Sequence, residues 1–312
     1  TGGGVETNKI DVVTSGLDVS RCKPEPKDID LVKRLGLEGK FVAGYIGTLG
    51  MGHSLETILE AADYLRREPG GEVFSFMFLG DGARKAALQE RAHAMNLDNV
   101  VFVNSVAKHE VVKYWALIDA SIIHLKKSDV FTQVIPSKLF ESMGMGIPVL
   151  HGVAGESADI VARDGVGLVF EPENSTQLAE QLSLLKKDRV LYDALREGCL
   201  RATPKYERRQ LAHEMLEVLN TTVSQHARPA ESMRVLFVNR YFFPDCSATS
   251  QLLTELAEDL IAQGASVTVI SGRTLYQGKV SKLAVRDVHK GIRIVRVGFF
   301  RFDRSHTLGR LA

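Results

Sequence analysis

The sequence has few of the residues that mark disulfide-rich, metal-binding or membrane-spanning proteins. Only 3 cysteines occur in 312 residues, and Cys22, Cys199 and Cys246 are too scattered for a disulfide framework or a metal site. No apolar run approaches the ~20 residues that a membrane-spanning helix needs. Disulfide frameworks and bilayer spans are therefore excluded, and we expect a reducing, cytoplasmic compartment.

An excess of charge of one sign is also absent, because 39 Lys and Arg nearly balance 38 Asp and Glu. The hydrophobic share of 45% and the charged share of 25% match those of ordinary globular proteins, and they exclude a disordered or fibrous chain. At roughly 100–200 residues per domain, a chain of this length is expected to form two domains of similar size.

The near-zero net charge hides a basic C-terminal segment. Residues 273–312 hold ten Lys and Arg against two Asp, a net charge of +8, which leaves −7 for the 272 residues before them. A basic segment on an acidic body predicts an anionic partner, such as a membrane surface or a phosphate-bearing substrate. A solvated loop without any partner is an equally weighted alternative.

The first two-thirds of the chain alternates short apolar runs with stretches of helical period, which predicts βα units on a parallel sheet. The strands are expected at residues 10–14, 41–46, 75–79, 100–102, 120–124, 148–151 and 167–170. The helices between them are expected at residues 55–67, 83–95, 109–117, 137–145, 157–163 and 177–187. Many strands lack polar alternation, as expected when helices cover both faces. The fold class is therefore α/β, with a doubly wound, Rossmann-like parallel sheet.

The rest of the chain predicts more helix, a linker and the start of a second domain. Helical patterns at 190–201 and 207–222 precede a polar stretch without period, 224–232. A β-α-β pattern then begins, with strands at 233–239 and 267–270 and a helix at 248–263. The sequence stops soon afterwards, so we expect only a partial second Rossmann-like domain.

Four turns follow predicted strands, at the carboxyl ends where open α/β sheets bind their ligands. The first, 44–53, is rich in glycine, which lets the backbone approach a ligand closely, although a tight turn before a helix needs glycine in any case. The second, 78–82, contains Gly80 and Asp81, and a cap on the following helix is the favoured explanation of that aspartate. The fourth, 152–157, is another glycine-rich helix entrance.

The third turn, 135–141, carries the most specific pattern. Pro136 suits a first helical position, so the backbone N–H groups that follow it point out of a positive helix end. Lys138 adds charge, and Glu141 lies about one turn further on, near the same face. This arrangement could hold a diphosphate and a ribose, and a capped surface helix with a solvated Lys–Glu pair is the alternative.

Together these segments resemble the donor-binding half of a retaining, GT-B-type glycosyltransferase of family four, of the subgroup that assembles cell-surface polysaccharides or glycolipids. The strongest similarity runs from Pro136 to Glu141 and on through 143–150, and the resemblance covers residues 5–222. It implies the tail of a preceding acceptor domain at 1–10, a nucleotide-sugar donor-binding domain at 11–204, and a helix at 205–223 that crosses back to the partner domain.

The resemblance also implies roles for individual residues. The glycine turn would face the donor diphosphate, the helix end at 137–139 would bind it, Glu141 would hold the ribose and Val106 would lie beside the base. The candidate donor-binding residues are Gly47, Thr48, Gly80, Asp81, Val106, Lys126, Ser137, Lys138, Leu139 and Glu141.

Two departures from the family pattern affect the phosphate site. Thr48 and His53 stand where the family commonly has an arginine and a lysine, and the family's spaced glutamate pair keeps only its second member, because Gln133 replaces the first. We therefore expect Lys138 and Lys126 to meet the phosphate charge. A structural or capping role for His53 is favoured slightly over a ligand contact.

The segment 233–312 resembles the start of the family's acceptor-binding domain, which ordinarily precedes the donor domain. A circular permutation, two transferases joined end to end and an artificially joined fragment are the three explanations. The linker at 224–232 and Met233, placed where a start methionine would stand, favour the last two.

The resemblance implies an enzyme without a metal ion or other cofactor, with a nucleotide-sugar as donor substrate and retention at the sugar carbon. The catalytic residues would lie in the missing acceptor half. A lipid-linked or saccharide acceptor, peripheral membrane contact through 273–312 and no nucleic acid partner are expected. An epimerase or hydrolase acting on nucleotide-sugars, and a fragment that binds nucleotide without turnover, are the alternatives.

Overall fold

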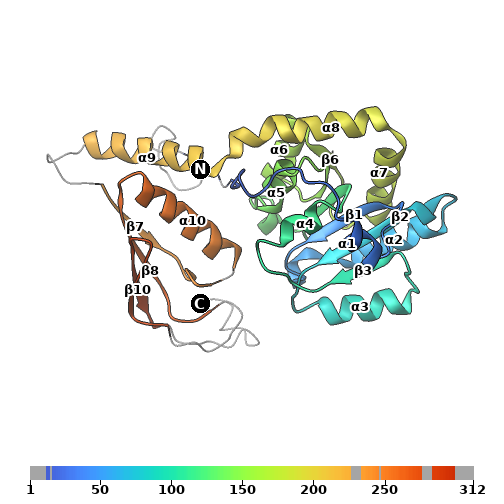
Figure 1. The fold of residues 1–312 in the computed structure, drawn as a ribbon, viewed down its shortest axis with the longest axis horizontal. Coiled ribbons are helices and arrows are strands. Elements are labelled where there is room, and N and C mark those ends of the chain that lie inside the picture. Colours follow the sequence, from blue (N-terminus) through green and yellow to red (C-terminus); the bar gives the residue numbers. More distant parts are fainter. Residues whose placement is uncertain (1–11, 15, 226–232, 246, 276–282, 299–312) are drawn as a thin grey trace. The chain divides into compact units, whose positions relative to one another are not determined.

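The computed structural model describes residues 12–14, 16–225, 233–245, 247–275 and 283–298 (Figure 1). The chain divides into two compact units. The larger unit is Gly16–Glu207, and the smaller unit combines Arg208–Ala312 with the segment before Gly16. Within the described residues, no helix is both long and apolar enough to cross a membrane.

The larger unit is built on a six-stranded parallel sheet with the strand order β3-β2-β1-β4-β5-β6. Its strands are β1 (Phe41–Ile46), β2 (Phe74–Leu79), β3 (Val100–Val103), β4 (Ala120–His124), β5 (Val149–Gly152) and β6 (Gly167–Val169). The central strands are buried along their whole length. The predicted α/β class and parallel sheet are confirmed.

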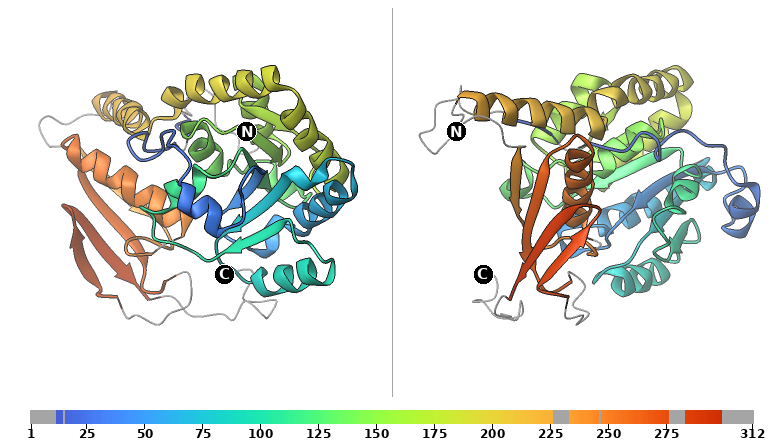
Figure 2. Two further views of the ribbon diagram at one scale, coloured as in Figure 1. Left: turned by 45° about the vertical axis from the view of Figure 1, so that its right-hand side comes forward. Right: turned by 60° about the vertical axis from the view of Figure 1, so that its left-hand side comes forward.

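Helices cover both faces of this sheet (Figure 2). They are α1 (Ile29–Arg34), α2 (Glu56–Arg67), α3 (Lys85–Ala94), α4 (Val111–Trp115), α5 (Lys138–Gly144), α6 (Glu156–Asp164), α7 (Ser175–Lys187) and α8 (Arg189–Ala202). Adjacent residues of β1 show the two layers, because Tyr45 packs in the cluster with α2 and α7 whereas Ile46 packs in the cluster with Trp115 of α4. Side chains alternate along a strand, so each face needs its own helices.

Most predicted elements lie within a few residues of the observed ones. One predicted strand is not found in its described residues, and one observed helix was not predicted. Residues 12–14 carry no strand, while 10 and 11 lie outside the described residues. Helix α1 was not predicted, because its six residues are too few to show a helical period; Asp28 starts it by accepting a hydrogen bond from the Leu31 N–H.

The smaller unit contains α9 (Arg208–Gln225), β7 (Arg234–Val238), α10 (Ala248–Ala262), β8 (Ser266–Gly272), β9 (Arg286–His289) and β10 (Ile292–Val297). Its sheet has the order β7-β8-β10-β9, in which β9 alone runs antiparallel. The expected β-α-β start and partial second sheet are present, and the β9–β10 hairpin is an addition that sequence reasoning did not predict.

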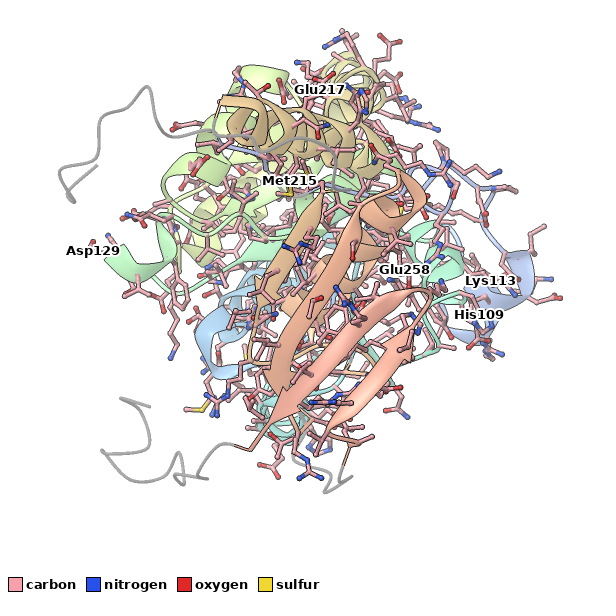
Figure 3. All side chains as sticks on the ribbon, turned by 90° about the vertical axis from the view of Figure 1, so that its left-hand side faces the viewer. His109, Lys113, Asp129, Met215, Glu217 and Glu258 are labelled. Atoms are coloured by element: carbon pink, nitrogen blue, oxygen red, sulfur yellow. The ribbon has the colours of Figure 1, made fainter. Side chains whose placement is uncertain are left out.

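Helix α9 packs within the smaller unit. Met215, labelled in Figure 3, and Leu216 lie against the apolar cluster formed by α10 and the sheet. Arg208 and Glu255 form an ion pair at 2.6 Å with exposed fractions of only 15% and 17%. These contacts join α9 to α10 rather than leaving it as an isolated helix.

Arg296 corrects part of the expectation for the basic segment. Its side chain is 1% exposed, and it donates to the carbonyl oxygens of Phe243 and Ala284 and to the Asp287 carboxylate. One of the ten cations is therefore an internal brace of the smaller unit and cannot contribute to a basic surface. Residues 276–282 and 299–312, which carry five of the others, lie outside the described residues.

Candidate functional site

The strand order of the larger unit singles out one place for a ligand. The chain leaves β1 toward β2 on one side and leaves β4 toward β5 on the other, although β1 and β4 are neighbours. At such a switch point the connections diverge and open a crevice beyond the carboxyl ends of the strands. The segments that follow β1 and β4 here are the glycine turn (residues 47–53) and residues 125–137.

Backbone hydrogen bonds tie the turns at this end of the sheet together. The N–H of Gly47 donates to Leu79 O (2.8 Å), that of Gly80 to Val103 O (3.1 Å) and that of Leu49 to Asp81 O (2.9 Å). A Cβ at Gly80 would collide with the carbonyl oxygen of Gly47. The glycine at position 80 is therefore required by close backbone approach, and the turns after β1, β2 and β3 form one connected surface.

Lys138, from the first turn of α5, lies over the glycine turn. A Cβ at Gly47 would collide with its side-chain carbon Cε, so the absence of a side chain at Gly47 makes room for the lysine. The ammonium Nζ is 3.2 Å from the Tyr45 hydroxyl and 4.5 Å from the centre of the Tyr45 ring. Tyr45 itself donates to Thr48 O at 2.8 Å.

These contacts form a relay from Lys138 through Tyr45 to the backbone of the glycine turn. Burial raises the pKa of Tyr45 well above its usual range, so its hydroxyl keeps its proton for Thr48 and accepts from the lysine. Burial lowers the pKa of Lys138 to about 8, against the opposing effect of Glu141. At pH 7 Lys138 is therefore a half-buried cation in contact with Tyr45, and not the fully solvated partner of Glu141 that the alternative expects.

His53 ends the short 3-10 turn η2 (Met51–His53) and lies edge-on to Tyr45, with ring centres 5.9 Å apart. Burial and the neighbouring Lys138 lower its pKa to about 4, so the ring is neutral at pH 7. Its half-buried ring packs against Tyr45, which is consistent with the structural role expected for it. His53 therefore supplies no positive charge to the glycine turn at pH 7.

The other predicted residues lie in the loop after β4, at the N-cap of α5 and on α5 itself. The backbone N–H of Lys126 donates to Gly52 O at 3.0 Å, while its side chain is exposed. Leu139 is fully buried in the core, so it can offer a ligand only its backbone. Ser137 makes no side-chain cap bond to α5, and Glu141 is half-buried.

Asp81 and Val106 occupy the turns on the β2–β3 side. The Asp81 carboxylate accepts from the N–H of Gly82 at 2.8 Å and is exposed; α3 begins only at Lys85, without a side-chain cap. The predicted helix cap is therefore wrong. Val106 is half-buried and packs against the apolar core beneath β3. It takes no part in the contacts between Lys138 and Tyr45.

Sequence reasoning missed Tyr45 and Lys85. Tyr45 sits inside an apolar strand, where an aromatic residue indicates only a core position. Lys85 donates to Gly80 O at 3.1 Å and to Asn104 Oδ1 at 2.5 Å, which places a second ammonium beside the glycine turns. A lysine in the first turn of a predicted helix gives no signal of such contacts.

Comparison with known proteins places this arrangement in a family. Residues 28–200 match the family described as glycosyl transferases group 1. The chain belongs to this family. Sulfoquinovosyl transferase SQD2 of Arabidopsis thaliana is 24% identical over 210 residues, 66% of this chain and 38% of SQD2. The Vi polysaccharide biosynthesis protein VipC/TviE of Salmonella typhi is 27% identical over 173 residues, 53% of this chain and 27% of its own length.

Solved group 1 and related structures share the fold. The C-terminal domain of the group 1 glycosyl transferase LpcC from Francisella tularensis superimposes with a TM-score of 0.52 at 21% identity, covering 62% of this chain and 99% of that domain. Anabaena HepE, solved with UDP-glucose, gives 0.60 at 18% identity, covering 70% of this chain and 59% of HepE. The chain spans less than half the length of the curated relatives it matches.

Proposed function

We propose that the larger unit binds a nucleoside-diphosphate sugar at the switch point, as the donor half of a glycosyltransferase. The observation that carries the proposal is the Lys138 ammonium, held over Gly47 by the Tyr45 hydroxyl. A half-buried cation beside a glycine backbone without a side chain fits an anion that must approach closely. The solved complex of HepE with UDP-glucose supports this class of ligand.

The remaining donor contacts follow from the placement of the candidate residues. Gly47, Thr48 and the backbone of 137–139 would meet the diphosphate together with Lys138. Glu141 would accept hydrogen bonds from the ribose hydroxyls, because a carboxylate has two acceptor oxygens. Val106, on the β3 side, would pack against the base, with Gly80, Asp81 and Lys126 at the rim. Because His53 is neutral, the charge beside the glycine turns comes from the ammonium groups of Lys138 and Lys85, which contact Tyr45 and Gly80.

The proposed reaction is transfer with retention to a hydroxyl acceptor. The bond between the sugar carbon and the diphosphate oxygen breaks, and a bond from the acceptor oxygen to the same carbon forms on the same face. The acceptor's proton passes to the departing diphosphate. The negative charge that develops on the diphosphate is stabilised by Lys138, which is in place before the reaction begins.

The biological setting completes the proposal. The role of VipC/TviE in the biosynthesis of the Vi polysaccharide supports a role of this chain in the assembly of a cell-surface polysaccharide or glycolipid. The acceptor would be lipid-linked or a saccharide, and residues 233–312 would form the start of an acceptor-binding domain. The basic segment 273–312 would contact the cytoplasmic face of a membrane.

Binding of UDP, GDP and ADP to the chain by calorimetry tests the donor site. Lys138→Met should weaken the preferred nucleotide about 10- to 100-fold, because a hydrogen bond to a charged group contributes about 1.5–3 kcal/mol. Lys27→Met is the matched control, since Lys27 pairs with Asp119 at 2.8 Å beside the opposite end of β1. Equal affinities of the two variants would overturn the proposed site.

Turnover distinguishes the proposed reaction from its alternatives. Isotope-labelled sugar from the matching nucleotide-sugar should appear in a hydroxyl acceptor in an assay of the full protein. Free nucleotide released without any acceptor would indicate a hydrolase instead. Nucleotide binding without either product would indicate a module that only binds.

A further inference from the structure

Strand β4 ends in a histidine that is absent from the donor contacts proposed above. His124 is 1% exposed, and both ring nitrogens bond to backbone groups of other loops. Nδ1 is 2.7 Å from the carbonyl oxygen of His53, 71 residues earlier, and Nε2 is 2.8 Å from the N–H of Glu173, 49 residues later. The ring also stacks on Phe170, with centres 5.7 Å apart and planes 6° from parallel.

The chemistry of these partners fixes the state of the imidazole. The His53 carbonyl can only accept, so Nδ1 must carry the hydrogen. The Glu173 amide can only donate, so Nε2 must present its lone pair. His124 is therefore neutral and in a single tautomer whenever both bonds are made.

The residues on either side of this imidazole are conformationally unusual. Glu173 has φ +68° and Ser54 has φ +45°, in the left-handed region that glycine favours. The Ser54 hydroxyl donates to Glu173 Oε1 at 2.6 Å, and the Lys127 N–H donates to Oε2 at 3.1 Å. Such conformations persist only where surrounding contacts impose them, and here the loops after β1, β4 and β6 meet around His124 and Glu173.

We propose that His124 is a positioning residue for the donor site: as a neutral imidazole it clamps the end of the glycine turn to the loop at 171–173. The turn carries Gly47 and Thr48 at one end and the clamped His53 carbonyl at the other. The clamp rests on the structure alone, whereas its effect on donor binding rests on the proposed function. His124 acts through the backbone and is not a catalytic residue.

The charges around His124 determine how the clamp responds to acid. Burial lowers the pKa of His124 below its usual value as the largest effect, whereas the hydrogen bond to the His53 carbonyl and the Glu173 and Glu56 carboxylates raise it. The rings of His53 and His151 are its neighbouring imidazoles. Protonation would place an N–H against the N–H of Glu173, so that bond must break. The bond to the His53 carbonyl would survive. Acid should therefore release the loop at 171–173 first.

The clamp is tested on the full chain with substitutions that keep part of the hydrogen bonding. His124→Asn retains a donor near the position of Nδ1, His124→Leu removes both bonds, and His93→Asn on the exposed face of α3 is the matched control. Nitrogen-15 NMR of the wild type should show a neutral ring protonated on Nδ1. Amide exchange at Glu173 should accelerate at least 10-fold in both His124 variants and stay unchanged in His93→Asn.

UDP affinity, or that of the preferred nucleotide, supplies the functional readout. His124→Leu should weaken nucleotide binding about 10-fold. His124→Asn and the wild type below the His124 pKa, which both keep the bond to the His53 carbonyl, should lose much less affinity. A charged ring at pH 7, the opposite tautomer, or unchanged Glu173 exchange in folded His124→Leu would overturn the clamp. Faster exchange with unchanged affinity in His124→Leu would overturn its positioning role. Failure of the wild type to bind any nucleotide would overturn the proposed function and the positioning role, while the NMR results still decide the clamp.

Discussion

The Tyr45 hydroxyl offers the sharpest test of how the donor site is held together. Tyr45→Phe removes one oxygen and leaves the ring in its contacts with Phe78 and His53. The lost oxygen accepts from the Lys138 ammonium at 3.2 Å and donates to Thr48 O at 2.8 Å. A bond to a charged group contributes about 1.5–3 kcal/mol and a neutral one about 1 kcal/mol.

The expected loss of stability is smaller than the sum of these two contributions. Thr48 is exposed, so water can replace the bond to its carbonyl, and Lys138 is only half-buried as a whole residue. We therefore expect Tyr45→Phe to lower the free energy of unfolding by about 1–3 kcal/mol. The freed lysine also loses its fixed position over Gly47, so nucleotide affinity should fall about 10-fold, equivalent to about 1.4 kcal/mol.

Urea unfolding and calorimetric titration with UDP, or with the preferred nucleotide, measure the two effects. Tyr192→Phe is the matched control, because its buried hydroxyl donates to Asp119 O at 3.1 Å and its ring packs on Phe41, at the beginning of β1. Both variants should lose stability, but only Tyr45→Phe should lose affinity. Equal affinities of the two variants would refute the relay, as would an unchanged stability of Tyr45→Phe.

Three further predictions concern the scaffold of the site. Burial lowers the pKa of His151 to about 3, so below about pH 6.5 the unfolded chain binds a proton at this histidine that the folded chain does not. His151 alone should therefore contribute about 1.4 kcal/mol per pH unit to the fall in unfolding free energy from about pH 6 to pH 3, and urea titration of His151→Asn should show a slope shallower by about that amount. Gly80→Ala should lower the free energy of unfolding by more than about 2 kcal/mol, because position 80 has φ +147° and the new Cβ would collide with the Gly47 carbonyl oxygen. In the control Gly39→Ala, where φ is +69° and the space is open, the loss should be only about 1 kcal/mol. Equal melting temperatures of the two variants would contradict the close approach of the backbone at Gly80. Asp164→Ala should lower the free energy of unfolding by about 1–3 kcal/mol, because its buried carboxylate accepts hydrogen bonds from the Tyr206 hydroxyl at 2.7 Å and the Lys205 ammonium at 2.9 Å. An unchanged free energy of unfolding in chemical denaturation would contradict this role.

The local pattern of apolar residues and glycines in the sequence was sufficient to predict the central strands of the larger unit and the turns that follow them. The unalternated apolar runs at 41–46 and 120–124 became the central strands β1 and β4 with the predicted bounds. The turns that follow them were predicted as ligand-facing, and the strand order places both at the switch point. Such features are carried by residues next to each other in the chain, because burial of both faces and tight glycine turns are decided over a few residues.

Pattern failed where contacts join distant parts of the chain. Lys138 and Tyr45 are 93 residues apart in sequence, so neither the solvated-pair alternative for Lys138 nor the position of Tyr45 in an apolar strand indicated that they meet. The capping role of Asp81 was wrong because α3 begins later than expected. Arg296 counted toward a basic surface, yet the β9–β10 hairpin buries it.

The sequence by itself determined the α/β class, the parallel sheet, the family resemblance and the group of turns at the carboxyl ends of its strands. Only the tertiary structure decided which side chains act together there: Lys138 over Gly47 through Tyr45, and His124 between His53 and Glu173. The physical reason is that secondary structure and turns follow local backbone preferences and periodicity, whereas charge, tautomer and hydrogen-bond partners depend on burial between segments that meet only after folding.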